Sequence, residues 1–383
     1  MKRRDFLKKA GIGAAAAAAG ITGLAGCARE EEKPKEAAAP AVVTKKTYKW
    51  KMTSTWPSGL PVLQEGAVRI AKRIKEMSDG RLEIQVFAGG ELAPPLETFA
   101  AVSDGTVECG TGAAYYWAGK EAACQWFAAV PFGMNAQGMA AWNYSGDGLK
   151  LWEETYAPFG VIPRPGGNTG VQMGGWFNKK IESIDDYKGL KMRIPGLGGK
   201  VMAKAGGTVV LVAGGEIFTN LERGVIDATE WVGPYHDLRM GFYQAAKYYY
   251  YPGWHEPGTE LEFIFNKKAY EALPADLQHI VDAACAENAS WALAEFDANN
   301  GAALQTLINE HKVQVFKFPD KVLDALRPLA QEVVEEEAAK SPMAKKVYES
   351  FRKFQKVVGT WGSISEKSYY DMLAPKYLSL IHI

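Results

Sequence analysis

The sequence has no excess of charge of either sign, because 44 lysine and arginine residues are matched by 44 aspartate and glutamate residues in a chain of 383. Proteins that bind nucleic acid need a basic surface to attract phosphates, so nucleic acid is not an expected partner. A disordered or collagen-like chain is also excluded, because 47% of the residues are hydrophobic. The length suffices for two domains, or one large one, with a substantial core.

The sequence also lacks the short motifs of common enzymes. It contains no H-E-x-x-H, no G-x-S-x-G and no G-x-x-x-x-G-K-[ST]. The glycine-rich run at 196–200 lacks the third glycine of a dinucleotide-binding motif and directly follows Pro195. The five histidines show no metal-ligand spacing. The sequence therefore contains no motif that supports an enzyme.

Cysteine is scarce, with four residues in the chain and no C-x-x-C pair, so a zinc or redox motif is absent. Apart from Cys27, the cysteines are Cys109, Cys124 and Cys285. Three cysteines allow at most one disulfide within the chain. We expect them instead to be buried as small apolar side chains.

The N-terminus has the features of an export signal in residues 1–26. Arg3-Arg4-Asp5-Phe6-Leu7-Lys8 precedes an apolar run, rich in alanine and glycine, that is short for a stable bilayer span. The paired arginines resemble a twin-arginine signal, which exports folded proteins. Leu24-Ala25-Gly26-Cys27 is similar to a bacterial lipobox, in which the Cys27 sulfur is lipidated after cleavage before it. The alternative is an ordinary signal with an incidental cysteine.

Residues 27–46 predict a flexible tether, because they are rich in Glu, Lys, Ala and Pro and show no apolar period. A lipid, a tether and then a folded body place the protein outside the cytoplasmic membrane, in the periplasm, and anchored to the membrane. Without residues 1–26 the chain carries 39 basic and 43 acidic residues, so the mature protein is mildly acidic.

Three stretches share a helix, a glycine turn and an extended segment, which indicates an α/β fold with mostly parallel strands. The helical parts are 60–77, 96–102 and 217–222, and the extended parts are 82–86, 106–109 and 225–228. The glycine-rich stretch 165–175 is the natural place for a crossing between lobes. After residue 266 the pattern is helical, with a short strand at 313–318 and helix starts at Pro274 and Pro319; further helical sequence runs to about residue 377 and is interrupted at Pro342.

The segment 168–176 is a candidate ligand contact. If it is extended, Asn168, Gly170, Gln172 and Gly174 share one face, and two amides flanked by glycines suit the close approach of a ligand. The alternative is a turn with a glycine-rich bulge.

Two charged residues stand at predicted strands. Arg193 lies in a short strand at 191–195, where alternation alone favours an edge strand with solvated charges. Glu230 alternates with Ile226 and Ala228, so it should lie on an apolar face at the carboxyl end of a strand. A buried carboxylate there needs a partner or a cation, and ligands of α/β sheets collect at those ends.

Aromatic residues are dense at 115–117 and 248–254, where tyrosines and tryptophans with polar tips suit a small-ligand cleft. Packing in the core is the alternative use of these rings.

Together these segments resemble the substrate-binding proteins of tripartite ATP-independent periplasmic (TRAP) transporters, in particular the branch that binds 2-oxo acids and lactate. The resemblance covers about residues 50–354 and is densest in 166–177, 226–235 and 248–254. It implies an α/β, two-domain, periplasmic-binding-protein-like fold with long C-terminal helices and a cleft that closes on the ligand. Domain I would comprise 47–165 with about 252–300, and domain II 166–251 with about 301–383. The last residues, 379–383, match no pattern of the family.

The resemblance also implies a set of site residues. Arg193 would pair with the ligand carboxylate, since its planar fork suits bidentate binding. Asn168 would hydrogen-bond the ligand. A cation, Ca²⁺ or Na⁺, would bridge ligand and protein through oxygen donors. Its protein ligands would be Gln172, Glu230, the main-chain carbonyl of Trp231, and Glu256. The pocket would be lined by Tyr115, Tyr116, Trp117 and Trp231, although the family pattern has a tyrosine at position 117, which leaves substrate size open.

We therefore expect a solute-binding protein that captures a small 2-oxo or 2-hydroxy monocarboxylate, such as pyruvate or lactate, and delivers it to TRAP membrane subunits. Arg193, two glutamates, the ligand carboxylate and Ca²⁺ sum to zero charge, which favours a divalent ion in a dry cleft without excluding Na⁺. One alternative is a cation-dependent enzyme on small 2-oxo acids, with Glu256 as general base. The other is a ligand-sensing receptor subunit. Whether the protein forms a homodimer stays open.

Overall fold

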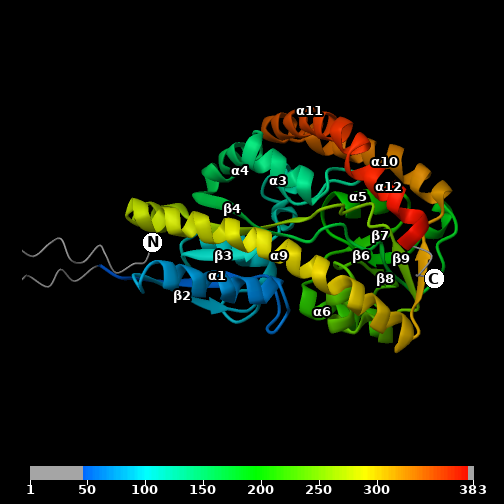
Figure 1. The fold of residues 1–383 in the computed structure, drawn as a ribbon, viewed down its shortest axis with the longest axis horizontal. Coiled ribbons are helices and arrows are strands. Elements are labelled where there is room, and N and C mark those ends of the chain that lie inside the picture. The colour runs from blue at the N-terminus through cyan, green and yellow to red at the C-terminus, as the bar shows by residue number, and fades with distance from the viewer. Residues whose placement is uncertain (1–45, 378–383) are drawn as a thin grey trace, which may run out of the picture. The chain divides into compact units, whose positions relative to one another are not determined.

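The computed structural model describes residues 46–377, which form two mixed β-sheets with helices packed around them (Figure 1). The predicted signal at 1–26, the lipidation site Cys27, the tether up to residue 45 and the tail 379–383 lie outside the described residues. Within residues 46–377, no helix is both long enough and apolar enough to cross a membrane.

The first sheet has the strand order β2-β1-β3-β10-β4. Strand β1 pairs in parallel with β2 and β3, whereas β10 runs antiparallel to both β3 and β4. The strands are β1 (Tyr48–Ser54), β2 (Leu82–Phe87), β3 (Cys109–Gly112), β4 (Val161–Asn168) and β10 (Glu260–Asn266).

The second sheet has the order β11-β9-β5-β8-β6-β7. Strand β6 is parallel to β7 and β8, β11 is parallel to β9, and β5 is antiparallel to β8 and β9. The strands are β5 (Gly175–Phe177), β6 (Lys191–Arg193), β7 (Thr208–Val210), β8 (Ala228–Thr229), β9 (Tyr248–Tyr251) and β11 (Gln314–Lys317).

Each sheet is more mixed than the predicted, mostly parallel arrangement. Strands β5 and β10 enter by loops that cross from the other sheet, as β4 leads to β5 and β9 leads to β10. Neither loop is a crossover connection within one sheet, so these connections do not make the entering strand parallel to its neighbours. The glycine-rich stretch at 165–175 does carry a crossing between the sheets, as expected. How the chain divides into domains stays a prediction.

The helices follow the apolar periodicity of the sequence. In α1, Ala67, Ile70 and Ile74 are buried and pack in one apolar cluster with residues of the first sheet and α9. The helix starts at Pro274 and Pro319 and the break at Pro342 are confirmed. The helices are α1 (Leu63–Met77), α2 (Thr98–Ser103), α3 (Ala136–Ser145), α4 (Gly148–Tyr156), α5 (Gly196–Lys204), α6 (Gly214–Glu222), α7 (Pro234–Met240), α8 (Lys267–Glu271), α9 (Ala275–Asn309), α10 (Asp320–Ala338), α11 (Pro342–Ile364) and α12 (Glu366–Tyr377).

Two strands begin three residues later than predicted. The predicted segments 106–109 and 225–228 are replaced by β3 and β8, which start at Cys109 and Ala228. Gly105 and Gly224 adopt left-handed conformations at the ends of α2 and α6, with φ of 75° and 69°. The backbone N–H groups of the next two residues then bond back to helix carbonyls and are not available to a sheet.

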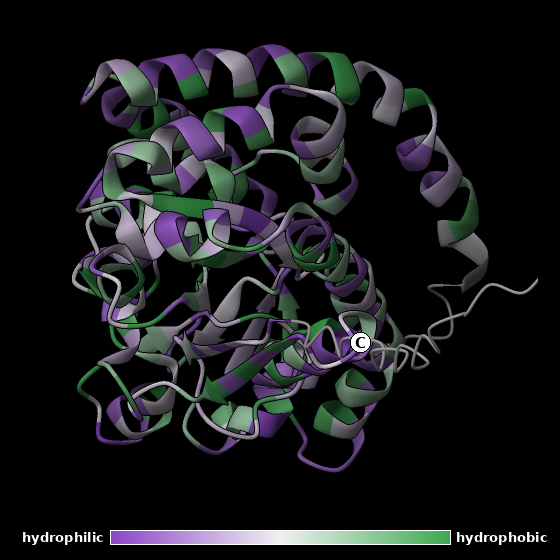
Figure 2. Ribbon diagram, turned by 90° about the vertical axis from the view of Figure 1, so that its left-hand side faces the viewer, coloured by the Kyte–Doolittle hydropathy of each residue, from purple (hydrophilic) through white to green (hydrophobic). Residues whose placement is uncertain are grey.

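The C-terminal helices carry both hydrophobic and hydrophilic residues along their length (Figure 2). In α11 the buried residues Val347 and Phe351 pack in the large core cluster, which also includes residues of both sheets. The three cysteines outside the N-terminal region are free and buried, as expected.

Candidate functional site

Two neighbouring strands of the second sheet bring Arg193 and Glu230 together. Arg193 is the last residue of β6 and Glu230 directly follows β8, and because these strands are parallel and adjacent, their carboxyl ends coincide. Both side chains are about 1% exposed. The edge-strand alternative for Arg193 is wrong, since β6 lies between β8 and β7 and only Lys191 faces solvent.

The Arg193 guanidinium is surrounded by polar and aromatic groups. Its Nη1 donates to the Glu230 carboxylate and its Nη2 lies 3.4 Å from the Tyr116 hydroxyl. The guanidinium carbon lies 5.3 Å from the centre of the Trp231 ring, a cation–π contact. The pair therefore holds one charge of each sign in a desolvated environment. Nε and Nη1 also lie 3.5 and 3.4 Å from the main-chain oxygens of Val212 and Glu230, so a second anion must replace some of these long contacts to use both arms of the fork.

The two loops that cross between the sheets supply the other half of the site. Backbone bonds join them, from Gly253 N to Gln172 O (2.8 Å) and from Gln172 N to Glu256 O (3.2 Å). Close contact requires glycine here, because a Cβ on Gly253 would lie 2.3 Å from the Gln172 carbonyl oxygen. The segment 168–176 is extended only at its ends, because β4 ends at Asn168, β5 begins at Gly175, and residues 169–174 between them are irregular, which favours the alternative of a turn.

These loops place Gln172 and Glu256 side by side. Gln172 Nε2 donates to Glu256 Oε2 at 2.8 Å and to the Thr169 and Thr259 hydroxyls at 3.2 and 3.1 Å. The Thr259 hydroxyl also donates to Glu256. The remaining oxygens, Gln172 Oε1 and Glu256 Oε1, are buried and have no hydrogen-bond partner within residues 46–377.

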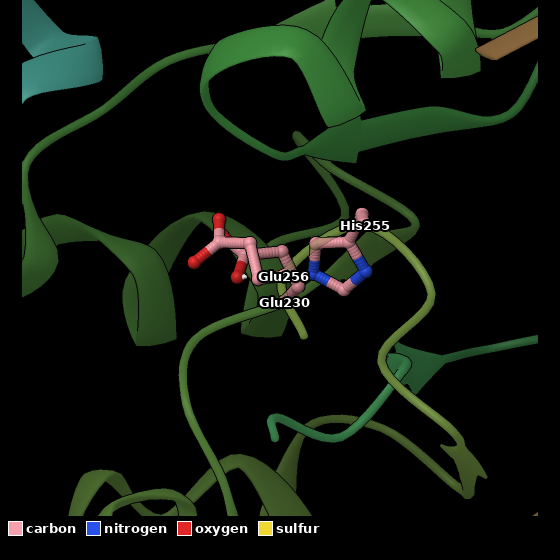
Figure 3. A group of neighbouring side chains, drawn as sticks. All are labelled: Glu230, His255 and Glu256. Atoms are coloured by element: carbon pink, nitrogen blue, oxygen red, sulfur yellow. Dashed lines mark hydrogen bonds and ion pairs between the residues drawn. The ribbon is translucent and has the colours of Figure 1, made fainter. Parts of the chain in front are cut away.

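Glu230, His255 and Glu256 form one buried group whose ligand atoms all lie within 4.8 Å of one another. Figure 3 shows the His255 ring beside the two glutamates, with one ring nitrogen turned toward them. That nitrogen, Nε2, lies 3.4 Å from Glu230 Oε2.

Burial dominates the electrostatics of this group. It raises the pKa of Glu230 to about 7, against the opposing effect of Arg193, and the pKa of Glu256 to about 8, with a further contribution from Glu230. It also lowers the pKa of His255 to about 4, so this imidazole is neutral near pH 7. A single arginine is thus not enough to keep both desolvated carboxyl groups ionised, and a bound cation would stabilise their charged forms.

The donor set fits a hard metal cation. Gln172 Oε1 and Glu256 Oε1 are unpartnered oxygens of the kind that Na⁺ and Ca²⁺ prefer, and Glu230 supplies a further carboxylate. His255 fits less well, because its Nδ1 has no partner in the described residues. Histidines that bind metals usually donate their second N–H to a partner. His255 is therefore better placed to interact with Glu230 than to bind the ion.

A cavity of about 10 Å³ lies between the two halves of the site. This volume accommodates about one water molecule. Its lining includes Tyr115, Tyr116, Gln172, Arg193, Trp231 and Thr259. In this structure the cavity therefore has too little room for a molecule of several heavy atoms.

Most of the predicted site residues meet here, namely Arg193, Gln172, Glu230, Trp231, Glu256, Tyr115 and Tyr116. Asn168 and Trp117 do not line the cavity. The Asn168 amide donates to Glu260 (3.1 Å) and to the Gly258 carbonyl (3.3 Å). The Trp117 indole turns into the core of the first sheet, where it donates to Glu262.

Sequence reasoning missed His255, Thr169 and Thr259, which are all about 1–2% exposed. His255 precedes Glu256 and Thr259 follows it by three residues, but neither spacing is a recognisable ligand pattern. Only the contact between the two crossing loops brings them into the site.

Comparison with known proteins supplies a family. The profile described as "Bacterial extracellular solute-binding protein, family 7" (DctP) matches residues 52–341. The monocarboxylate 2-oxoacid-binding periplasmic protein of Nostoc sp. is 43% identical over 96% of this chain and 98% of its own length.

Solved structures agree with this relationship. A TRAP periplasmic solute-binding protein from Pseudoalteromonas atlantica, with bound sodium and pyruvate, is 43% identical with a TM-score of 0.83, over 85% of this chain and 99% of that one. One from Colwellia psychrerythraea, with bound calcium and pyruvate, is 43% identical with a TM-score of 0.82 over the same shares of the two chains.

Proposed function

The chain belongs to family 7 of the bacterial extracellular solute-binding proteins, and from this premise we propose that it captures a small 2-oxo monocarboxylate such as pyruvate together with a metal cation. It is a periplasmic solute-binding protein of the TRAP type and not an enzyme. The fold is that of the TRAP binding proteins. The observation that carries the proposal is the buried arginine beside two buried glutamates, where Glu256 Oε1 and Gln172 Oε1 have no hydrogen-bond partner among the described residues.

Arg193 is the group proposed to bind the ligand carboxylate. Its fork donates from several N–H groups in one plane, which matches the two oxygens of a carboxylate. Tyr116 lies within 3.4 Å of the guanidinium and Trp231 covers it, so both would contact a small ligand held there.

The cation is proposed to be held by Gln172, Glu230, the main-chain carbonyl of Trp231, and Glu256. It would supply the positive charge that the two glutamates lack and would also attract the oxygens of a 2-oxo acid. The relatives described above contain sodium in one case and calcium in the other. Charge balance with Arg193, two glutamates and one ligand carboxylate favours the divalent ion.

Capture is proposed to proceed by opening and closing of the site. The cavity between the halves is too small for pyruvate, so ligand enters a more open form. Contacts made only when both halves meet around ligand and cation then favour closure.

We also propose how the protein is exported and where it delivers its ligand. The segment 1–26 would direct export through the twin-arginine route, and lipidation of Cys27 would anchor the protein to the membrane through the 27–46 tether. The closed protein would deliver its ligand to TRAP membrane subunits.

Calorimetric titration of the metal-stripped protein with pyruvate and with lactate, each with and without calcium or sodium, tests the proposal. We expect tight binding of a 2-oxo acid only when cation is present. Failure of both acids to bind under any of these conditions would contradict the substrate class. Binding that is equally tight after chelation would contradict the cation.

A further inference from the structure

His236 is a buried histidine that lies next to the site but takes no part in it as described above. It belongs to the first turn of α7 and is 0% exposed. Its Nε2 lies 2.8 Å from the Pro61 carbonyl oxygen, and its Nδ1 lies 3.2 Å from the indole nitrogen of Trp231. The ring also packs against Phe296, with 4.8 Å between ring centroids.

The two partners determine the proton position on His236. The indole N–H of Trp231 can only donate, so Nδ1 must accept. The Pro61 carbonyl can only accept, so Nε2 must carry the hydrogen and donate to it. Burial keeps the ring in this neutral form by lowering the pKa of His236 to about 3.

These two bonds join opposite sides of the ligand cavity. Pro61 lies in the loop between β1 of the first sheet and α1, whereas Trp231 follows β8 of the second sheet. Trp231 covers Arg193 and meets Trp56, from the same loop as Pro61, edge-on at 6.2 Å. Both Trp56 and Trp231 line the cavity.

The loop that receives the bond is in a strained conformation. Val62 has φ 55° and ψ −54°, and the Pro61 carbonyl also accepts the N–H of Leu63, which defines the rarer form of the γ-turn. A positive φ is unfavourable for a β-branched residue. Such a conformation persists only where the surroundings hold it, and His236 is one of the groups that contact it.

The helix that carries His236 is firmly attached to the second sheet. The neighbouring Asp237 accepts hydrogen bonds from Trp176 (2.9 Å) and Tyr249 (2.7 Å), which belong to β5 and β9. It also accepts the N–H of Val232 at 3.4 Å. These bonds fix the first turn of α7 to the second sheet, and His236 extends from that turn to Pro61 in the loop that follows β1.

We propose that His236 is a positioning residue that joins the 55–62 loop, chiefly through its bond to Pro61, to α7 and Trp231 of the second sheet, and so keeps the two walls of the ligand site together in the closed protein. It does not touch the ligand; it acts through Trp231 and the loop. The inference rests on the proposed function for its ligand-binding consequence, whereas its effect on the loop is independent of any ligand.

Three substitutions separate the two bonds. His236→Gln keeps a donor near the position of Nε2 and so retains the bond to Pro61, whereas His236→Asn keeps an acceptor near Nδ1 and retains only the bond to Trp231. His236→Phe loses both bonds but preserves the ring that packs on Phe296. Thermal unfolding of all three variants serves to separate general destabilisation from the specific effect.

The experiment measures the dissociation rate of pyruvate by stopped-flow tryptophan fluorescence in the presence of calcium. Because variants of one site differ mainly in dissociation rate, we expect dissociation about tenfold faster for His236→Phe and His236→Asn. We expect His236→Gln to stay within about threefold of the wild type. Equal rates for all four proteins, or a loss as large in His236→Gln as in His236→Phe, would overturn the proposal.

Hydrogen exchange of the ligand-free proteins distinguishes failure of this proposal from failure of the proposed function. We expect faster exchange of the amides in residues 55–66 for His236→Phe and His236→Asn than for the wild type and His236→Gln. If the wild type binds no 2-oxo acid, the proposed function fails and this exchange pattern alone decides the role of His236. Unchanged exchange in His236→Phe would then refute it.

Discussion

Replacing Arg193 by methionine removes the proposed carboxylate-binding group while keeping a side chain of similar length. The substitution also strands Glu230, because Arg193 and Glu230 form a buried ion pair with each side chain about 1–2% exposed. Removing one member of a buried pair typically destabilises a protein by about 3–5 kcal/mol. With an unfolding entropy of about 2 cal/mol/K per residue, this corresponds to a fall in Tm of about 4–7 °C for a folded body of this length.

Two further changes identify the source of this loss of stability. Acidification to pH 5 should reduce the loss of stability. The pKa of Glu230 is already raised by burial and rises further without the arginine, so at pH 5 the carboxyl takes up a proton and no charge is left buried without a partner. Adding Glu230→Gln to the variant removes the stranded charge at neutral pH and should restore most of the stability. Urea unfolding of the single and double variants at pH 5 and pH 8 measures both effects.

Binding should not recover with stability. Loss of a buried charged partner of the ligand typically costs about 2–5 kcal/mol, so we expect at least about a 30-fold weaker affinity for pyruvate in both variants. Calorimetry in saturating calcium measures it. A single variant that binds pyruvate within threefold of the wild type would refute the role of Arg193, and a double variant no more stable than the single one would refute the origin of the stability loss.

Three further predictions follow from particular contacts. Glu256→Gln should weaken pyruvate binding by about tenfold at a fixed calcium concentration, because the change makes the cation site less negative, and excess calcium should partly restore the affinity. The matched control is Glu271→Gln, at an exposed position. Pyruvate affinity that changes neither with the substitution nor with chelator would argue against a cation bridge. Glu262→Gln should flatten the pH dependence of stability: burial raises the pKa of Glu262 from 4.5 to about 7, so the folded state holds a proton that the unfolded state releases, and wild-type stability relative to the variant should fall by up to about 3 kcal/mol between pH 4.5 and 7 in urea titrations. A constant difference between the two proteins over this range would exclude that titration. Gly174→Ala should destabilise by about 1–3 kcal/mol, since its Cβ would lie 2.3 Å from the Phe318 ring, whereas Gly301→Ala, with open space around it, should not; equal Tm values for the two would contradict the packing described.

The sequence predicts those parts of the fold that depend on local patterns. The apolar period of α1, the prolines that begin α9 and α10, and the glycines that end α2 and α6 are all read correctly, because each depends on residues a few positions apart. The starts of β3 and β8 are not, because bonds that return to the preceding helix compete with the sheet for the same N–H groups.

The site is predictable to a similar degree. The burial of Glu230 follows from its alternation with apolar neighbours, whereas alternation alone misleads for Arg193, because strand order decides whether a charged residue faces solvent. The resemblance to a family supplied Arg193, Gln172 and Glu256 as site residues. The positions of Trp117 and His255 depend on how loops distant in sequence pack together, for which the local sequence gives no signal.

The long helix α9 has a mechanical consequence for any opening of the site. Its 35 residues extend over about 52 Å without an internal proline. It packs on α1 and on β4, a strand of the first sheet, and also on α7, which follows β8 of the second sheet. One continuous helix therefore contacts the elements of both sheets (Figure 1). A rotation of one sheet relative to the other must therefore bend α9 or make α9 slide against α1 and β4 or against α7. We therefore expect the stiffness of α9 to oppose such a rotation.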